Sequence, residues 1–315
     1  MGKSTIICAR ACLTRVTAAA FVALLRFQKH GNAMTRIEKA GFAPTRRAVL
    51  RLGLCAAAFR YAPARAGAPD PALIGRKRAA TAADSARIAA LQSRQSGVLF
   101  FDDFADPTDL ARNWSVFTDD RSDLLACRSA DSLHPGPSGL QIETLQARNC
   151  HDRWSTGQII SKRSFGFGYF EAYLRIASAP GIDNAFWLTT QGGTNDGSGD
   201  EFELDVAEVM YPNDVHITLH RHNLEKHADS SELGFDHRAT EPLADGYHYY
   251  SALWTRDEIV FGFNGQAMGV IETNGVIHGS VNLRVSTALG PFGGAPPADP
   301  KGLTMDVKHV RVLSA

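Results

Sequence analysis

Residues 199–208 read Gly-Asp-Glu-Phe-Glu-Leu-Asp-Val-Ala-Glu and hold five carboxylates in nine positions from Asp200 to Glu208. Side chains of a β-strand alternate between its two faces. A strand here would carry three acids on one face: Glu201, Glu203 and Asp205. Its other face would carry apolar side chains suited to a core: Phe202, Leu204 and Val206. The stretch therefore predicts a strand with a row of carboxylates on one face.

The last acid, Glu208, breaks this alternation, because it follows Glu203 by five residues and would point into the core. A β-bulge between Asp205 and Glu208 would add one residue and return Glu208 to the acidic face. Bulges are common next to active sites. We therefore expect a bulged strand whose carboxylates form a functional site.

Glycoside cleavage explains why such a site needs carboxyl groups. One protonated carboxyl gives a proton to the leaving oxygen, and a second, ionised carboxylate acts at the sugar carbon. Closely spaced carboxylates imply a covalent intermediate and retained stereochemistry. An aspartate between them can adjust which partner keeps its proton.

Residues 203–208 resemble the bulged Glu-x-Asp-x-x-Glu signature of glycoside hydrolase family 16. The resemblance implies that Glu203 is the nucleophile, that Asp205 assists it and that Glu208 is the acid/base. It also implies a β-jelly-roll sandwich, similar to concanavalin A, with a concave substrate cleft. The similarity runs over roughly residues 98–313, through flanking segments that resemble strands of the family: 157–162, 168–172, 184–188, 248–254 and 307–312.

Short β-type runs separated by turn residues also predict an all-β sandwich, because no βαβ alternation and no long amphipathic helix are present. These runs are 98–101, 140–144, 168–176, 185–189, 202–209, 214–220, 247–254, 258–263, 281–287 and 305–313. Asn264-Gly265 predicts a tight hairpin. Two irregular segments, 191–200 and 291–302, are expected to rim the cleft. We expect a catalytic domain over residues 97–315, preceded at 67–96 by a linker or N-terminal arm.

Charge is distributed unevenly along the 315-residue chain. Residues 1–66 hold 12 Lys and Arg and one acid, Glu38, which leaves 21 basic and 32 acidic residues in the remainder. An acidic body argues against nucleic acid and against strongly anionic polymers as partners, but does not exclude a local basic pocket.

Residues 1–66 resemble a targeting segment. Arg46-Arg47 precede a weakly apolar run at 52–59, and Ala64-Arg65-Ala66 matches a cleavage signal. We expect twin-arginine export to the periplasm or the exterior, with a mature start near Gly67; a merely basic, disordered arm is the alternative. Met34 is a possible true start. The longest earlier apolar run, 18–25, is too short to span a membrane.

Three of the five cysteines, Cys8, Cys12 and Cys55, lie in the segment expected to be removed. The mature chain keeps Cys127 and Cys150, which predict one disulfide bond in an exported protein. Two buried thiols are the alternative.

Aromatic and polar side chains near the acids are candidates for sugar binding, because sugar faces stack on aromatic rings and hydroxyls need polar partners. We predict that substrate contacts Trp187, Asn184, His220 and Trp154. Trp114 and Trp254 are expected in the core.

Three histidines, His216, His220 and His222, share one face of a predicted strand, and an H-x-H pair also suits a metal site. The acid expected three or four residues after the pair is missing, so we predict no metal and place His220 in the cleft. The resemblance would put a calcium ligand at the position of Lys308. Because an ammonium group is not a cation ligand, we do not expect calcium to bind there. No cofactor is expected.

These patterns predict a monomeric, retaining endo-β-glycosidase that hydrolyses a β-linked polysaccharide. A β-1,3- or β-1,3-1,4-glucan is favoured, and an exopolysaccharide and a galactan remain open as substrates. No membrane span and no nucleic acid partner are expected. A non-catalytic carbohydrate-binding protein on the same fold and a transglycosylase are the alternatives. The intact acid triad argues against the first of these.

Overall fold

The structure, a computed structural model, describes residues 74–120, 123–148, 150–225 and 230–315. The predicted export segment 1–66 and residues 67–73 lie outside these ranges, and the domain boundaries stay a prediction. The described residues all belong to one compact unit. Among the described residues, no helix is long and apolar enough to cross a membrane.

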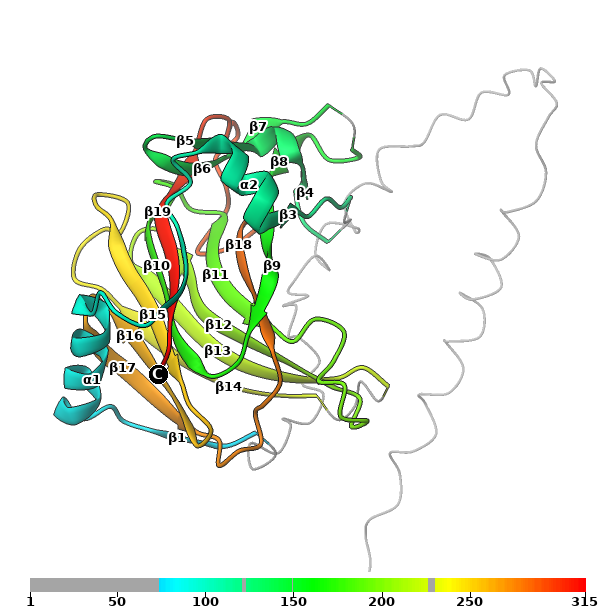
Figure 1. Ribbon diagram of the computed structural model, residues 1–315. Coiled ribbons are helices and arrows are strands. Elements are labelled where there is room, and N and C mark those ends of the chain that lie inside the picture. Colours follow the sequence, from blue (N-terminus) through cyan, green and yellow to red (C-terminus); the bar gives the residue numbers. More distant parts are fainter. Residues whose placement is uncertain (1–73, 121–122, 149, 226–229) are drawn as a thin grey trace, which may run out of the picture. The chain divides into compact units, whose positions relative to one another are not determined.

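A seven-stranded antiparallel sheet carries the acidic strand as its third strand (Figure 1). Its strands, in spatial order, are β14 (Ser231–Arg238), β13 (Asp214–Asn223), β12 (Asp200–Met210), β11 (Ile182–Thr189), β18 (Val281–Leu289), β9 (Gln158–Phe165) and β3 (Trp114–Val116). On each of the central strands, every second side chain therefore lies on the same face of the sheet as the acids.

A nine-stranded sheet packs against the first. Its path is β1 (Arg76–Arg78), β17 (Gln266–Glu272), β16 (Glu258–Phe263), β15 (His248–Trp254), β10 (Gly168–Arg175), β19 (Thr304–Leu313), β6 (Gly139–Glu143) and β5 (Leu133–Gly136), with β2 (Val98–Asp102) also paired to β19. The two sheets bury one large apolar cluster that includes Phe170 and Trp254 from this sheet and Phe202 and Leu204 from the other. The expected β-jelly-roll sandwich is therefore confirmed.

Smaller elements complete the fold: a three-stranded sheet of β4 (Ala126–Arg128), β8 (Trp154–Thr156) and β7 (Leu145–Gln146), helices α1 (Ala82–Ser93) and α2 (Pro107–Asn113), and a 3-10 turn η2 (Ala130–Ser132). The predicted hairpin joins β16 to β17, with positive φ at Asn264 and Gly265. Trp114 and Trp254 are buried, as predicted.

Residues 74–93, from the segment predicted as a linker or arm, are docked on the sandwich. Strand β1 pairs with β17, and α1 lies against β16 and β17 (Figure 1). Thr81 and Asp84 form a capping box at the start of α1, and Ile88 and Leu91 are buried against the sheet. This part of the chain is therefore an ordered arm rather than a linker.

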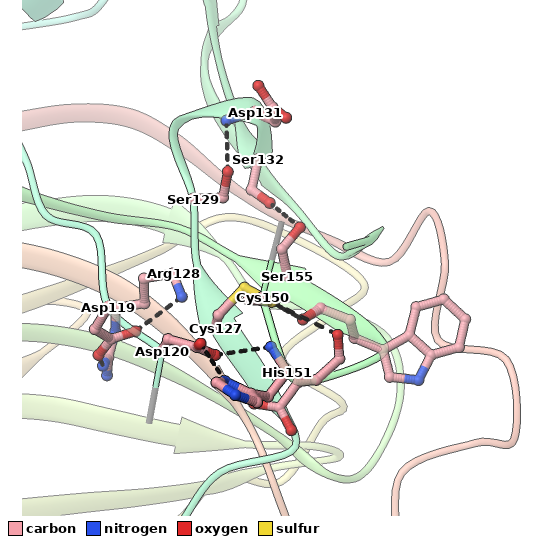
Figure 2. The surroundings of a disulfide bond; sticks show 12 residues. Asp119, Asp120, Cys127, Arg128, Ser129, Asp131, Ser132, Cys150, His151 and Ser155 are labelled. Atoms are coloured by element: carbon pink, nitrogen blue, oxygen red, sulfur yellow. Dashed lines mark hydrogen bonds and ion pairs between the residues drawn. A yellow bond between two sulfur atoms is a disulfide. The ribbon is translucent and has the colours of Figure 1, made fainter. Parts of the chain in front are cut away.

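A disulfide bond joins Cys127 of β4 to Cys150, with the two Cα atoms 6.4 Å apart. The alternative of two free thiols is therefore wrong. Figure 2 shows two ion pairs beside the sulfurs, Arg128 with Asp119 and His151 with Asp120. A cavity of about 410 Å³ lies next to them.

The position at which the resemblance would put a calcium ligand holds Lys308, whose Nζ donates to the Ser138 carbonyl oxygen. The neighbouring Asp306 is buried and accepts from Arg175 and Gln141. Both side chains thus already have protein partners.

Replacing Cys127 and Cys150 together by Ser should lower the free energy of unfolding by about 3 kcal/mol, because the unfolded chain regains the entropy of a loop of this length. Denaturant unfolding of the oxidised protein and of the double variant measures this difference. Reduced wild type is the control and should match the variant. Equal stability of the oxidised and reduced wild type would contradict the expectation.

Candidate active site

The bulge predicted in the acidic strand is present in β12. The pairing of β12 with β13 shifts register between Asp205 and Glu208, and Glu208 lies opposite His216. Glu203 and Asp205 lie opposite His220 and Thr218. Because residues 216, 218 and 220 alternate along one strand, they share a face, and so do the three acids opposite them. The predicted acid row is therefore formed.

His220 lies within this row. Its Nε2 is 3.0 Å from Asp205 Oδ2, and its Nδ1 is 3.5 Å from Glu232 Oε2. His222 stacks on it with ring centroids 5.4 Å apart and approaches Glu203 at 3.9 Å. His222 therefore also lies beside the acid row. His216 forms an ion pair with Asp236 at the rim.

Oxygens of Glu203 and Asp205 and a ring nitrogen of His220 lie within 4.8 Å of one another, close enough to share a cation. However, both ring nitrogens of His220 already face carboxylates. A protonated imidazole between two carboxylates needs no metal to balance its neighbours. The arrangement fits hydrogen bonding by His220 better than metal ligation.

The environment separates the pKa values of the two glutamates. Burial raises the pKa of Glu208 to about 7, and the charge of Asp205 adds to this effect. Burial acts in the same direction on Glu203, but the nearby His222 ring and the charges of His220, His222 and Arg284 outweigh it and lower its pKa. Near neutral pH, Glu203 is therefore ionised while Glu208 can keep its proton, which is the division that acid-assisted catalysis requires.

Trp187 lies on the acid face, as predicted, because it is directly opposite Asp205 in the pairing of β11 with β12. Its Nε1 donates to Ser286 Oγ at 3.0 Å, and the Arg284 guanidinium lies 4.5 Å from its ring. The indole is thus held in a fixed orientation beside the acids. Its contact with substrate stays a prediction.

The prediction that Asn184 binds substrate is wrong. Its side chain is 0% exposed and points to the core side of β11. Its Oδ1 accepts from the Ala177 amide, and its Nδ2 donates to the carbonyls of Ile182 and Val209. Asn184 ties the start of β11 to its neighbours and has no free group for a sugar.

Trp154 is not an open platform either. It is 9% exposed in an apolar cluster with Ala126 and Ile182, and the Arg153 guanidinium lies 4.8 Å from its ring. The prediction of a sugar contact at Trp154 is therefore wrong.

Asp183 is a member of the acid face that sequence reasoning missed. It is 8% exposed, and burial together with the charges of Glu208 and Asp205 raises its pKa well above the usual range. It lies four residues before Trp187 on β11, so the two side chains share a face, and the alternation of strand side chains would have identified it.

A groove of about 690 Å³ adjoins the acid row. Its lining includes Glu208, His216 and His220, together with Pro291, Phe292 and Gly293. The segment expected to rim the cleft at 291–302 does so through these residues. At the other end of β12, the Gly192 amide donates to Glu201, so the glycine-rich segment is tied to the acidic strand.

Replacing Asn184 by Ala should lower the free energy of unfolding by about 1–3 kcal/mol, because buried backbone groups lose their partner. Denaturant unfolding measures this loss. The exposed Ser178→Ala on the neighbouring segment is the control and should change stability by less than about 0.5 kcal/mol. Equal, small effects of the two changes would contradict a structural role for Asn184.

The model of the family described as glycosyl hydrolases family 16 matches residues 132–303. Two curated proteins of Rhizobium meliloti (strain 1021) are similar. The endo-1,3-1,4-beta-glycanase EglC is 31% identical over 57% of this chain and 37% of its own length, and the endo-1,3-1,4-beta-glycanase ExsH is 31% identical over 55% and 36%. The matches thus span little more than a third of these relatives.

Solved structures show the same fold at low identity. The laminarinase catalytic domain from Thermotoga maritima MSB8 superposes with a TM-score of 0.59 at 16% identity, covering 69% of this chain and 98% of that one. A mixed-linkage glucan enzyme of family 16 from Bacteroides ovatus gives 0.58 at 20%, covering 69% and 100%. With a family match over more than half of its length, the chain belongs to glycosyl hydrolase family 16 and is a glycoside hydrolase.

Proposed function

We propose that the protein is a retaining endo-β-glycosidase that hydrolyses a β-1,3- or β-1,3-1,4-glucan through a covalent intermediate on Glu203. The observation that carries this proposal is the opposite pKa shift of two carboxyl groups on one bulged strand, Glu203 lowered and Glu208 raised. The names of the similar rhizobial glycanases support the choice of glucan.

In the first step, ionised Glu203 attacks the anomeric carbon while Glu208 gives its proton to the departing glycosidic oxygen. The bond to the leaving sugar breaks and a glycosyl ester forms. In the second step, Glu208, now ionised, takes a proton from water. The water oxygen bonds to the anomeric carbon, Glu203 leaves as a carboxylate, and the original configuration is restored.

Asp205 and His220 serve both steps without making bonds to the sugar. Their ion pair holds one negative and one positive group in place beside the two glutamates. The charge of Asp205 favours the proton on Glu208, and that of His220 favours ionised Glu203. A protein that only binds carbohydrate would have no need of this separation.

Glu203→Gln should reduce turnover at least about 10³-fold while oligosaccharide binding persists, because the amide keeps the size of the side chain but not the nucleophile. Glu208→Gln should lose about 10²–10⁴-fold on polysaccharide. Substrates with a good leaving group need little protonation, so azide should restore turnover in Glu208→Gln and not in Glu203→Gln. NMR of the first product released by the wild type should show the β-anomer. An inverted product, or full activity of Glu203→Gln, would reject the assignment.

The dependence of kcat/KM on pH should be bell-shaped. Glu208 acts as an acid, so activity is present while it is protonated and falls about tenfold per unit as pH rises above about 7. Glu203 must be ionised, so activity also falls at acid pH, below the ordinary glutamate range. With a substrate that has a good leaving group, Glu208→Gln should lose the alkaline limb and keep the acid limb. An unchanged alkaline limb in that variant would show that another group titrates there.

A further inference from the structure

The groove beside the acid row reaches one of the two glutamates of the proposed mechanism. Glu208 lines it, whereas Glu203 is not among the described residues of its wall. In that mechanism Glu208 gives its proton to the departing glycosidic oxygen, and this oxygen belongs to the leaving part of the polysaccharide. The leaving part must therefore lie beside Glu208. The groove is the space that adjoins it, and its volume of about 690 Å³ lies in the range of cavities that hold ligands.

The groove runs across the strands and away from Trp187. Glu208 of β12 lies opposite His216 of β13, and His216 lies opposite Asp236 of the edge strand β14. Neighbouring strands are about 4.8 Å apart, so these three residues span about 10 Å. Trp187 is on β11, the neighbour of β12 on the other side. The two sides of the acid row thus offer separate surfaces to a sugar chain that crosses the sheet.

The N-terminal arm builds the far end of the groove. Lys77 of β1 lines the groove, although β1 belongs to the other sheet. Its Nζ donates to the Gly234 carbonyl oxygen of β14 at 2.6 Å and lies 5.1 Å from the centre of the Phe235 ring. These contacts hold the ammonium group at the edge of the sheet that carries the acids. Lys77 nevertheless stays exposed, so a ligand in the groove can reach it.

From this position Lys77 can donate to a sugar hydroxyl. An ammonium group has three N–H donors, and the Gly234 carbonyl oxygen takes one of them. Among the described residues that line the groove, Lys77 is the only Lys or Arg, while Glu232 and Asp236 supply carboxylates that accept hydrogen bonds. Because a sugar hydroxyl both donates and accepts, this mixture of a donor and acceptors suits a neutral sugar.

An aromatic ring borders the same groove. Phe292 is half-buried, and its ring lies so close to Gly290 that a Cβ atom there would come within 2.8 Å of it. The Phe292 carbonyl oxygen accepts from the Gly181 amide at 2.8 Å. Ring and backbone are thus both held in place, and sugar faces stack on aromatic rings. Phe292 therefore adds an apolar contact to the polar end of the groove at Lys77.

We propose that the groove binds the leaving part of a neutral β-glucan and that Lys77, supplied by the N-terminal arm, determines specificity by donating to its hydroxyl groups. This inference rests on the proposed glycanase function and assigns one side of its cleft. It gives the arm a direct part in substrate binding, in addition to its packing on the sandwich. An acceptor sugar that replaces water in the second step would occupy the same groove, because it approaches Glu208 from the side that the leaving sugar vacates.

The test compares two substrates that share the same non-leaving sugars. One is a β-1,3-1,4-glucan oligosaccharide, and the other ends in a dinitrophenyl group, which departs without sugar contacts. Lys77→Met should lower kcat/KM about tenfold on the oligosaccharide, the worth of one hydrogen bond from a charged group, and should leave kcat/KM on the dinitrophenyl glycoside unchanged. Lys77→Arg should keep most of the activity on the oligosaccharide, because it retains N–H donors.

Arg76→Met is the matched control. Arg76 is the neighbour of Lys77 on β1, but it is paired with Glu272 and is not among the residues described in the groove wall, so the change should alter neither kcat/KM value. Phe292→Leu is an independent change that keeps an apolar side chain over Gly290 and should lower kcat/KM on the oligosaccharide alone. Melting temperatures identify variants that fail to fold.

Folded variants of Lys77 and Phe292 that lower kcat/KM equally on both substrates would show a structural role and overturn the inference, and so would variants that lower neither value. A selective loss in Phe292→Leu alone would overturn the role of Lys77. In each of these cases cleavage by the wild type leaves the glycanase assignment intact. A wild type that cleaves neither substrate would overturn both.

Discussion

The geometry of the site depends on the bulge in β12. Without it, Glu208 would point into a core that is closed to water, and an unpaired carboxylate there would cost several kcal/mol. The extra residue lies between Asp205 and Glu208, where Val206 and Ala207 are both fully buried. The same shift appears in the pairing with β11, between Phe186 and Trp187. Both neighbouring strands therefore accommodate the bulge, and packing on either side holds it in place.

Carboxylates placed along one strand face repel one another, and the neighbouring strands offset this repulsion more at the Glu203 end than at the Glu208 end. β13 supplies His220 and His222 at the Glu203 end, where the pKa is lowered. The Glu208 end lies near the buried Asp183 and has only His216 opposite it, which is already paired with Asp236. The lowered pKa of Glu203 thus comes from residues on strands outside the acid motif, whereas the raised pKa of Glu208 comes from its burial and from the charge of Asp205 within the motif.

Much of this could be predicted from the sequence, for physical reasons that also explain the failures. Strict alternation of polar and apolar residues identified β12 and its bulge, because a core tolerates no uncompensated carboxylate. Strand β14 was missed, since it is a polar edge strand interrupted by Gly234 and carries little β signal. Asn184 and Trp154 were assigned from residue type alone. The alternation of side chains would have corrected Asn184, because it lies three residues from Trp187 and therefore on the opposite face of the strand. The burial of Trp154, in contrast, depends on contacts with residues distant in sequence.

The ordered arm shows how tertiary contacts override a weak local signal. Residues 79–91 have few large apolar side chains, so their helix is stabilised by burying Ile88 and Leu91 against the sheet. Arg78 joins Asp84 of the helix to Glu258 of β16, so helix and sheet share one ion-pair network. Strand β1 covers the open edge of β17, while Lys77 donates to the Gly234 carbonyl on β14 of the other sheet. Because β14 carries Glu232, the second partner of His220, the arm supports the edge of the sheet on which the acid site depends.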